Sequence, residues 1–215
     1  MLGVAVTSSS PAVAARCAWA RAGVGAVSTQ NVTDPSLGPR LLDLLATGRD
    51  PEQALHEVVT SAPYIEYRQL TVVDAQGSTA AYSGSEALGT FGTARGRDCC
   101  AAGNLLAHDG VLAAVVEGFA AGPERQLADR LLAGLRAGLA AGGEAGPIHS
   151  AGLVVVDRVP WPVADLRVDW SDDPIEELER LWELWRDQAD AYVQRALNPS
   201  VAPSYGVPGE GPRSG

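Results

Sequence analysis

Two groups of hydroxyl and amide side chains follow stretches typical of β-strands, and their types suit contact with a substrate. Ser8 and Ser9 end the segment LGVAVTSS. Thr29, Gln30 and Asn31 follow a second candidate strand in the same manner. Such side chains can orient a substrate, and one oxyanion donor contributes about 3 kcal/mol at a transition state. The structural alternatives are a polar strand end that enters a turn and a loop that leads into a helix.

Three further polar residues are candidates for contact with the same substrate. Arg68 lies early in a strand, and a buried ion pair with a carboxylate such as Asp74 is its structural interpretation. Asn104 follows a glycine at a strand end, where an amide can donate to a carbonyl oxygen. His149 precedes Ser150, but neighbours on a strand point to opposite faces and cannot form a dyad. The candidate substrate-binding residues are therefore Ser8, Ser9, Thr29, Gln30, Asn31, Arg68, Asn104 and His149.

Cysteines and histidines limit the nucleophile and cofactor chemistry. Cys17, Cys99 and Cys100 cannot build a disulfide framework, and they fit a reducing cytoplasm. Cys99 and Cys100 are adjacent, so they point to opposite faces of a strand, and no nearby imidazole activates either thiol. We interpret them as small buried residues. The histidines are scattered and no CxxC occurs, so the sequence predicts no metal site.

Charge and hydropathy exclude several classes of function. Of the 215 residues, 46% are hydrophobic and 20% are charged, as in an ordinary globular domain. The chain has 16 basic residues, all of them arginine, and 26 acidic residues, which gives a formal net charge of −10. An acidic chain without a basic stretch is a poor duplex binder, and without lysine it has no Schiff-base or P-loop chemistry. No apolar run is long enough to span a membrane. We expect a cytoplasmic protein that acts on a small molecule and binds neither nucleic acid nor membranes.

The elements that position these residues alternate between sheet and paired helices. Hydrophobic patterning and turn residues predict strands over 2–9, 22–30, 67–73, 78–83, 99–103 and 150–156. The predicted helices follow Asp34, begin at Asp50 with a capping box, and run over 111–120 and 123–141. The segment 150–156 is nearly all apolar, as in a strand covered on both faces. One layered domain over residues 1–160 is therefore expected.

The sequence pattern changes after Pro160. Residues 161–197 form an appendage with a strand and a helix, and the helix places apolar residues from Ile175 to Val193, including Trp182 and Trp185, on one face. That face either docks on the parent domain or forms a subunit interface, and we expect a homo-oligomer. Residues 198–215 are rich in Pro, Gly and Ser, which predicts a disordered tail.

Several stretches, taken together in this order, resemble a bacterial and archaeal family catalogued as domain of unknown function 1028. They cover most of residues 2–185: LGVAVTSSSPAVA at 2–14, WARAGVGAVSTQ at 19–30, DPSLGPRLLDLLATG at 34–48, YRQLTVVDAQGSTAAYSG at 67–84, GNLLA at 103–107, HSAGLVVV at 149–156 and DLRVDWSDDPIEEL at 165–178.

The resemblance implies an α+β fold in which two stacked sheets lie between helical layers, the αββα sandwich of the N-terminal-nucleophile hydrolases. In those enzymes a terminal Thr, Ser or Cys attacks an amide carbonyl, and its own α-amine, which titrates near pH 8, is the base. Family members usually begin about a dozen residues earlier, with a strand that carries this nucleophile. Met1 and Leu2 offer no such residue, so the catalytic residue is expected upstream of Met1, on a strand that this copy lacks.

Two departures from the family concern substrate contacts. The basic residues and the glutamine usual before the strand at Ser150 are replaced by GPIH, and a glutamine usual before Gly103 is replaced by Ala102. The resemblance implies hydrolysis of a carbon–nitrogen bond in a small soluble amide, provided that the full-length N-terminus supplies the nucleophile. The alternative is an inactive small-molecule binder or an oligomeric scaffold.

Overall fold

Nine strands form three hydrogen-bonded sheets in the computed structural model, which describes residues 1–208. The first sheet has the order β1-β8-β9, with bounds Leu2–Ser8, Ser150–Val156 and Ala164–Val168. The second has the order β2-β3-β4-β5, with bounds Ala18–Arg21, Gly25–Gln30, Gln69–Asp74 and Thr79–Ser83. The third is a hairpin of β6 and β7, over Thr90–Gly96 and Cys99–Leu106. Every pairing is antiparallel.

The first and third sheets lie side by side over the second. Strand β1 packs against β2 and β3, whereas β7 packs against β4 and β5. Small residues on β7 permit this close approach. The Cys100 thiol, for example, lies 3.5 and 3.7 Å from the carbonyl oxygens of Val72 and Ala80. The two stacked layers are therefore β9-β8-β1 followed by β7-β6 in one layer, and β2-β3-β4-β5 in the other.

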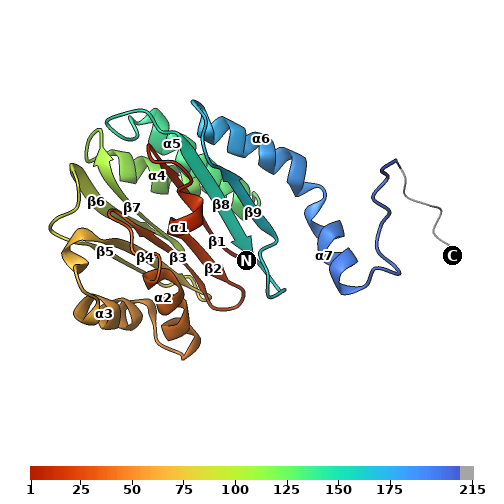
Figure 1. Ribbon diagram of the computed structural model, residues 1–215, viewed down its shortest axis with the longest axis horizontal. Coiled ribbons are helices and arrows are strands. Elements are labelled where there is room, and N and C mark those ends of the chain that lie inside the picture. The colour runs from red at the N-terminus through yellow and green to blue at the C-terminus, as the bar shows by residue number, and fades with distance from the viewer. Residues whose placement is uncertain (209–215) are drawn as a thin grey trace.

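Helices cover both outer faces of the stacked sheets (Figure 1). Helices α2 and α3 pack on the second sheet and α4 and α5 on the first and third, with bounds Leu37–Ala46, Pro51–Ser61, Val111–Ala120 and Leu127–Ala140. A short helix α1, Ala14–Cys17, and a 3₁₀ turn η1, Ile65–Tyr67, complete the body. The expected α+β class with helices outside two sheets is confirmed.

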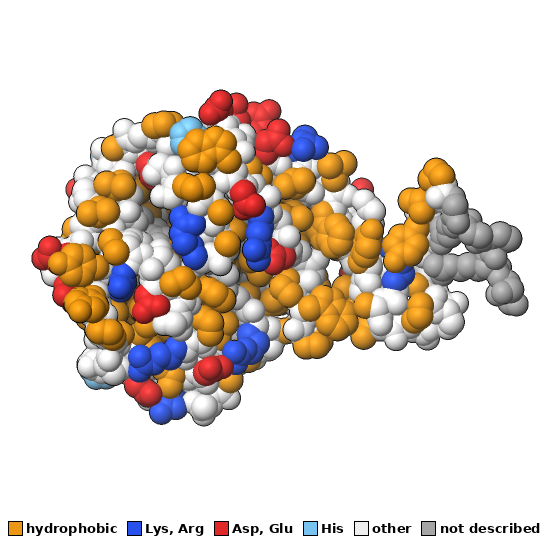
Figure 2. Space-filling view, viewed as in Figure 1, with side chains coloured by type: hydrophobic (Ala, Val, Ile, Leu, Met, Phe, Trp, Pro, Cys, Tyr) orange, Lys and Arg blue, Asp and Glu red, His pale blue; other side chains and the backbone are white. Residues whose placement is uncertain are grey.

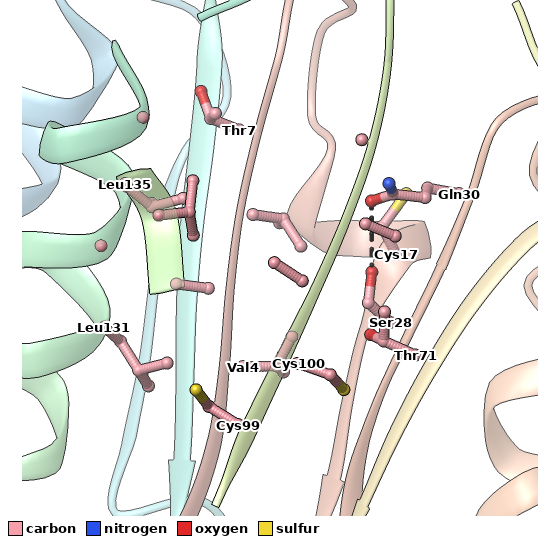
Figure 3. Close-up of a pocket in the computed structure, with 18 of the residues that line it drawn as sticks. Val4, Thr7, Cys17, Ser28, Gln30, Thr71, Cys99, Cys100, Leu131 and Leu135 are labelled. Carbon is pink, nitrogen blue, oxygen red and sulfur yellow. Dashed lines mark hydrogen bonds between the residues drawn. The ribbon is translucent and has the colours of Figure 1, made fainter. Parts of the chain in front are cut away.

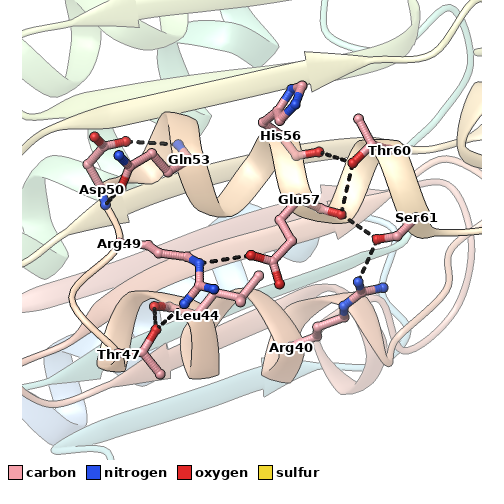
Figure 4. Close-up of polar contacts among 10 residues, drawn as sticks. All are labelled: Arg40, Leu44, Thr47, Arg49, Asp50, Gln53, His56, Glu57, Thr60 and Ser61. Carbon is pink, nitrogen blue, oxygen red and sulfur yellow. Dashed lines mark hydrogen bonds and ion pairs between the residues drawn. The ribbon is translucent and has the colours of Figure 1, made fainter.

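The helical hairpin of α2 and α3 has the local contacts that its sequence predicts (Figure 4). The Asp50 carboxylate accepts a hydrogen bond from the Gln53 backbone N–H at 2.8 Å, and the Gln53 side-chain oxygen accepts one from the Asp50 backbone N–H at 3.2 Å, which completes the capping box. Between the helices, Arg40 donates to the Ser61 hydroxyl at 2.6 Å. The predicted helix start is confirmed.

Strand β8 is the centre of the first sheet, and all seven of its residues are buried. This agrees with the expected covering of 150–156 on both faces. Gly152 faces α1 so closely that a Cβ there would lie 2.2 Å from the Cβ of Ala14. The apolar strand therefore needs a glycine where α1 crosses it.

Three element boundaries differ from the sequence predictions. The strand expected over 22–30 is the second arm of a hairpin, since 18–21 forms β2 and only 25–30 forms β3. Strand β6 was not predicted, because its alternating glycines and exposed residues lack a hydrophobic face. The single helix expected at the C-terminus is interrupted at 187–188, giving α6 over Pro174–Arg186 and α7 over Ala189–Leu197.

The C-terminal elements extend away from the sandwich as an arm, and hydrophobic side chains gather along it (Figures 1 and 2). Helix α6 packs on β8, β9 and α5. Beyond it, Arg195 of α7 donates to the carbonyl oxygens of Pro203 and Ser204, each at 3.0 Å, and lies 3.9 Å from the ring centroid of Tyr205. The predicted disordered tail thus includes residues that contact α7, whereas 209–215 lie outside the described residues.

Candidate functional site

A cavity of about 650 Å³ lies inside the sandwich, between β1 and β7. Leu131 and Leu135 project toward it from α5 on one side (Figure 3). Ser28, Gln30 and Thr71 reach it from β3 and β4 on the other side (Figure 3). Helix α5 therefore covers one side of the cavity and the second sheet covers the opposite side, while β1 and β7 flank it.

The distance between β1 and β7 leaves room for one extended strand. Because β1 lies over β2 and β3, and β7 lies over β4 and β5, the two strands stand about two strand spacings apart, roughly 10 Å. Among the described strands, β1 pairs only with β8, and β7 pairs only with β6. Strands β1 and β7 therefore present unpaired backbone N–H and C=O groups to each other. The space between them is wide enough for one extended strand.

Five of the eight candidate residues line this cavity. They are Ser8, Ser9, Gln30, Asn31 and Asn104, which come from the ends of β1, β3 and β7. The structure thus gathers hydroxyl and amide groups toward the end of the cavity where β1 and β3 finish. The opposite end lies near Met1 and the turn at 74–77.

A buried glutamine joins the amide side chains at this end. The Gln69 Oε1 accepts hydrogen bonds from Gln30 at 3.3 Å and from Asn104 at 3.0 Å. Its amide nitrogen donates to the Ser83 hydroxyl at 2.7 Å and to the Gly103 carbonyl at 2.9 Å. Gln69 of β4 is completely buried, so it fixes the orientation of two cavity-lining amides, one from β3 and one from β7. It was not among the candidates.

Asn31 helps to shape the rim of the cavity through its backbone and side chain. Asn31 and Val32 have φ values of 55° and 43°, in the left-handed region that a β-branched residue such as Val32 rarely adopts. The Asn31 amide donates to the Tyr67 carbonyl, and its oxygen accepts from the Leu88 N–H at 3.1 Å. Both polar ends of Asn31 therefore hold neighbouring loops in place.

The other three candidates lie away from the cavity. The Thr29 hydroxyl is buried, donates to the Arg16 carbonyl at 3.1 Å and accepts from the Trp19 indole at 3.3 Å. Arg68 is half-buried, and its Nε has no hydrogen-bond partner among the described residues. The structure does not bring these two side chains to the amide cluster.

His149 also lies outside the cavity wall. Its ring stacks on Trp170 with centroids 4.2 Å apart, and its Nδ1 is 3.3 Å from the Ser171 carbonyl oxygen. The neighbouring Ser150 hydroxyl instead donates to the Ser10 carbonyl at 2.6 Å. His149 and Ser150 thus have separate partners, as their adjacent positions on a strand predict.

The cavity also contains three thiols that burial keeps protonated. Burial raises the pKa of Cys100 to about 11, against an ordinary value of 9.0. It also raises the pKa of Cys99 and of Cys17. A thiol acts as a nucleophile through its thiolate, so these pKa directions disfavour a cysteine nucleophile in the described chain. Cys99 and Cys100 are half-buried, less buried than the sequence interpretation expects.

One acidic residue that sequence reasoning missed stands at the polar end of the cavity. The Glu144 carboxylate accepts from the Ser9 N–H at 3.2 and 3.4 Å. Its backbone forms a bridge with Leu106, the last residue of β7. The segment 143–145 therefore joins the ends of β1 and β7 and closes this end of the cavity. A single acid in a glycine-rich connection gives no spacing signal by which it could have been found.

Residues 1–208 contain neither a cluster of metal ligands nor a membrane-spanning helix. No three His, Cys, Asp or Glu side chains in that range converge as metal ligands. No helix there is long and apolar enough to cross a bilayer.

Comparison with known proteins identifies the family. No curated protein matches the chain significantly. The crystal structure of protein SPO2555 from Silicibacter pomeroyi, itself assigned to DUF1028, superposes with a TM-score of 0.81 at 29% sequence identity, over 90% of this chain and 84% of that one. The model of a family of unknown function, DUF1028, matches residues 1–178. The two-sheet sandwich and its cavity are therefore those of a chain that belongs to the DUF1028 family.

Proposed function

We propose that the complete protein is a hydrolase of the N-terminal-nucleophile type that cleaves a carbon–nitrogen bond in a small soluble amide. The strand-wide cavity between β1 and β7 carries this proposal. A strand that precedes Met1 fills the cavity, pairs with both free edges, and begins with a Thr, Ser or Cys whose α-amine is the base.

The direction of that strand follows from the position of β1. Strand β1 starts at Leu2, at the open end of the cavity, so a preceding strand joined to it by a short turn runs antiparallel to it. Its first residue then lies at the other end, near Ser8 and Ser9. The hydroxyl and amide groups gathered there are the ones available to orient a carbonyl substrate.

The length of β1 sets how many residues a partner strand needs before Leu2. Strand β1 has seven residues, and a hairpin turn adds two to five, so a partner strand requires roughly 9 to 12 residues before Leu2. In this proposal no metal or organic cofactor takes part, because the nucleophile and base belong to one terminal residue. Free cysteines at 17, 99 and 100 favour the cytoplasm as its compartment.

The first experiment is the intact mass and N-terminal sequence of the protein isolated from its native cell. We expect a chain about a dozen residues heavier that begins with Thr, Ser or Cys. That protein should hydrolyse a member of a panel of small amides, and replacing its first residue with alanine should abolish turnover. A native chain that starts at Met1 or Leu2 contradicts the proposal.

The rival function is an inactive binder or scaffold. The cavity volume of about 650 Å³ lies within the range of small-molecule sites, so this rival has a specific observation behind it. In that case a small ligand displaces water from the cavity of a chain that starts at Met1, and thermal shift against a metabolite panel is the measurement. Homo-oligomerisation stays a prediction under either function.

A further inference from the structure

Strand β9 leaves one edge of the first sheet unpaired. Among the strands of residues 1–208, β9 bonds only to β8, and it lies on the side of the sandwich from which the arm extends (Figure 1). Helix α6 packs on one face of β9, where Ala164 and Val168 share a hydrophobic cluster with Leu178. The free edge of such a strand presents backbone N–H and C=O groups to which a further strand can bond.

The strand carries an ion pair whose two members lie on the face away from α6. Arg167 donates to the Asp165 carboxylate through Nε and a terminal nitrogen, each at 2.8 Å. The Arg167 side chain is 45% exposed and that of Asp165 is 35% exposed. Leu166, between them, points to the opposite face and packs against the cluster beneath α6. Charged side chains on an edge strand restrict which strands can pair with it, so the order of their signs matters.

The order of the charges makes β9 complementary to a second β9. In an antiparallel pair centred on Leu166, Asp165 lies opposite the partner's Arg167, and Arg167 lies opposite the partner's Asp165. All five residues of β9 are paired in this register. A shift of two residues would place two aspartates or two arginines opposite each other, which destabilises the pair. A shift of one residue would bring the charged face of one strand beside the apolar face of the other.

The other edge strands among residues 1–208 lack this complementarity. Strands β1, β5 and β7 contain no charged side chain, and β2 and β6 contain one each, Arg21 and Arg95. These two arginines pair with helix carboxylates, Arg21 with Asp43 at 2.8 Å and Arg95 with Glu52 at 2.7 Å. Strand β9 is therefore the described edge strand that carries charges of both signs.

We propose that β9 is the interface with a second copy of this chain, paired edge to edge about a two-fold axis at Leu166. The two three-stranded sheets then form one continuous antiparallel sheet across the dimer. The inference goes beyond the proposed function, because β9 does not line the cavity. It also gives the expected homo-oligomer a defined surface.

Side chains beyond the strand enlarge this contact. Five paired residues make a small interface, and a stable dimer needs more buried surface than they supply. Continued past the strand ends, the same register brings Trp170, which is 61% exposed, beside the partner's Pro162. Both copies of α6 lie on the same face of the joined sheet. The hydrophobic side chains along the arm, including Leu184 at 58% exposure, are therefore available to add apolar contact (Figure 2).

The test exchanges the charges and measures the mass of the full chain by sedimentation velocity at micromolar concentration. The unmodified protein should sediment with twice the mass of one chain. Asp165→Arg places arginines opposite arginines, and Arg167→Asp places aspartates opposite aspartates, so each variant should sediment as a monomer. An equimolar mixture of the two variants should form a dimer with one copy of each, because every charge then meets its opposite.

Two controls separate the interface from the fold. The double variant Asp165→Arg with Arg167→Asp restores both the pair within the strand and the pairs across the axis, and it should dimerise by itself. Arg49→Asp breaks an ion pair of the same length, 2.8 Å to Glu57, on the α2–α3 hairpin. It should leave the dimer intact. Near-ultraviolet circular dichroism of the two single variants should match that of the unmodified protein.

The outcomes decide between β9 and other surfaces. A monomeric unmodified protein overturns the proposal. A dimer that persists in both single variants also overturns it, because another surface then holds the copies together. Single variants that stay monomeric after mixing, with unchanged circular dichroism, show that the register centred on Leu166 is wrong.

Discussion

The indole N–H of Trp182 on α6 donates to the Asp129 carboxylate on α5 at 2.9 Å. Trp182 is only 7% exposed and packs among residues of α5, β8 and β9. Trp185, one turn further, donates to the Val163 carbonyl at 2.8 Å. Of the two explanations for the aromatic stripe, docking on the parent domain is therefore the one that these contacts support.

The first prediction concerns this hydrogen bond. Trp182→Phe leaves the Asp129 carboxylate without its indole donor and creates a gap beside α5, so the free energy of unfolding should fall by about 2 kcal/mol. Urea unfolding measures the change. Trp161→Phe is the matched control, since Trp161 is 38% exposed, and it should change stability by less than about 0.5 kcal/mol. Unaltered stability with a smaller particle mass in light scattering would instead identify a subunit interface.

The second prediction concerns the buried glutamine. Gln69→Leu removes the acceptor for Gln30 and Asn104 and leaves the Gly103 carbonyl without its amide donor. Because these groups lie in a water-poor interior, the free energy of unfolding should fall by about 3 kcal/mol. Gln188→Leu, at an exposed position on the arm, is the control. Equal midpoints in a denaturant titration would show that the network does not stabilise the fold.

The third prediction concerns the free edge of β1. In a chain that starts at Met1, every second amide of β1 faces the cavity, so alternate amides should exchange with deuterium much faster than those bonded to β8. An exposed edge of this kind also favours aggregation. In the native full-length protein both sets should be protected. Uniform protection in the chain that starts at Met1 would mean that another group already covers the edge.

The fourth prediction concerns the pH dependence of Cys100. With a pKa of about 11, only about one thiol in ten thousand is ionised at pH 7, so alkylation should be slow and should accelerate about tenfold per pH unit. The unfolded chain ionises this thiol at lower pH than the folded one does, so the free energy of unfolding should fall between about pH 9 and 11. Cys100→Ala should reduce this slope. Rapid labelling at pH 7 would show that the thiol is not buried in solution.

Local sequence patterns predicted those parts of the fold that depend on interactions between residues close together in the chain. The capping box at Asp50, the β4-β5 hairpin around Asp74 and the buried apolar strand β8 each depend on a few neighbouring residues. Strand β6 was missed because the residues of β7 that pair with it are small, and because Gly92 and Gly96 interrupt the alternation of apolar and polar side chains along it. The break between α6 and α7 was missed because the apolar periodicity continues through it.

The candidate site was only partly accessible from sequence, because its organising contacts join distant positions. Gln69 reaches Gln30 and Asn104 across 39 and 35 positions, and Glu144 meets Ser9 across 135. No spacing rule connects residues so far apart. Strand-end reasoning did single out Ser8, Gln30 and Asn104, and all three side chains line the cavity.

The closure formed by residues 143–145 has a practical consequence for preparing the protein. A purification tag or fusion partner attached before the proposed first residue would have to pass through the tied ends of β1 and β7. Such an extension would keep the proposed strand out of the cavity between β1 and β7, or it would displace Glu144. Helix α7, on the C-terminal arm, instead extends away from the sandwich (Figure 1). Samples meant for activity assays should therefore carry their tags there.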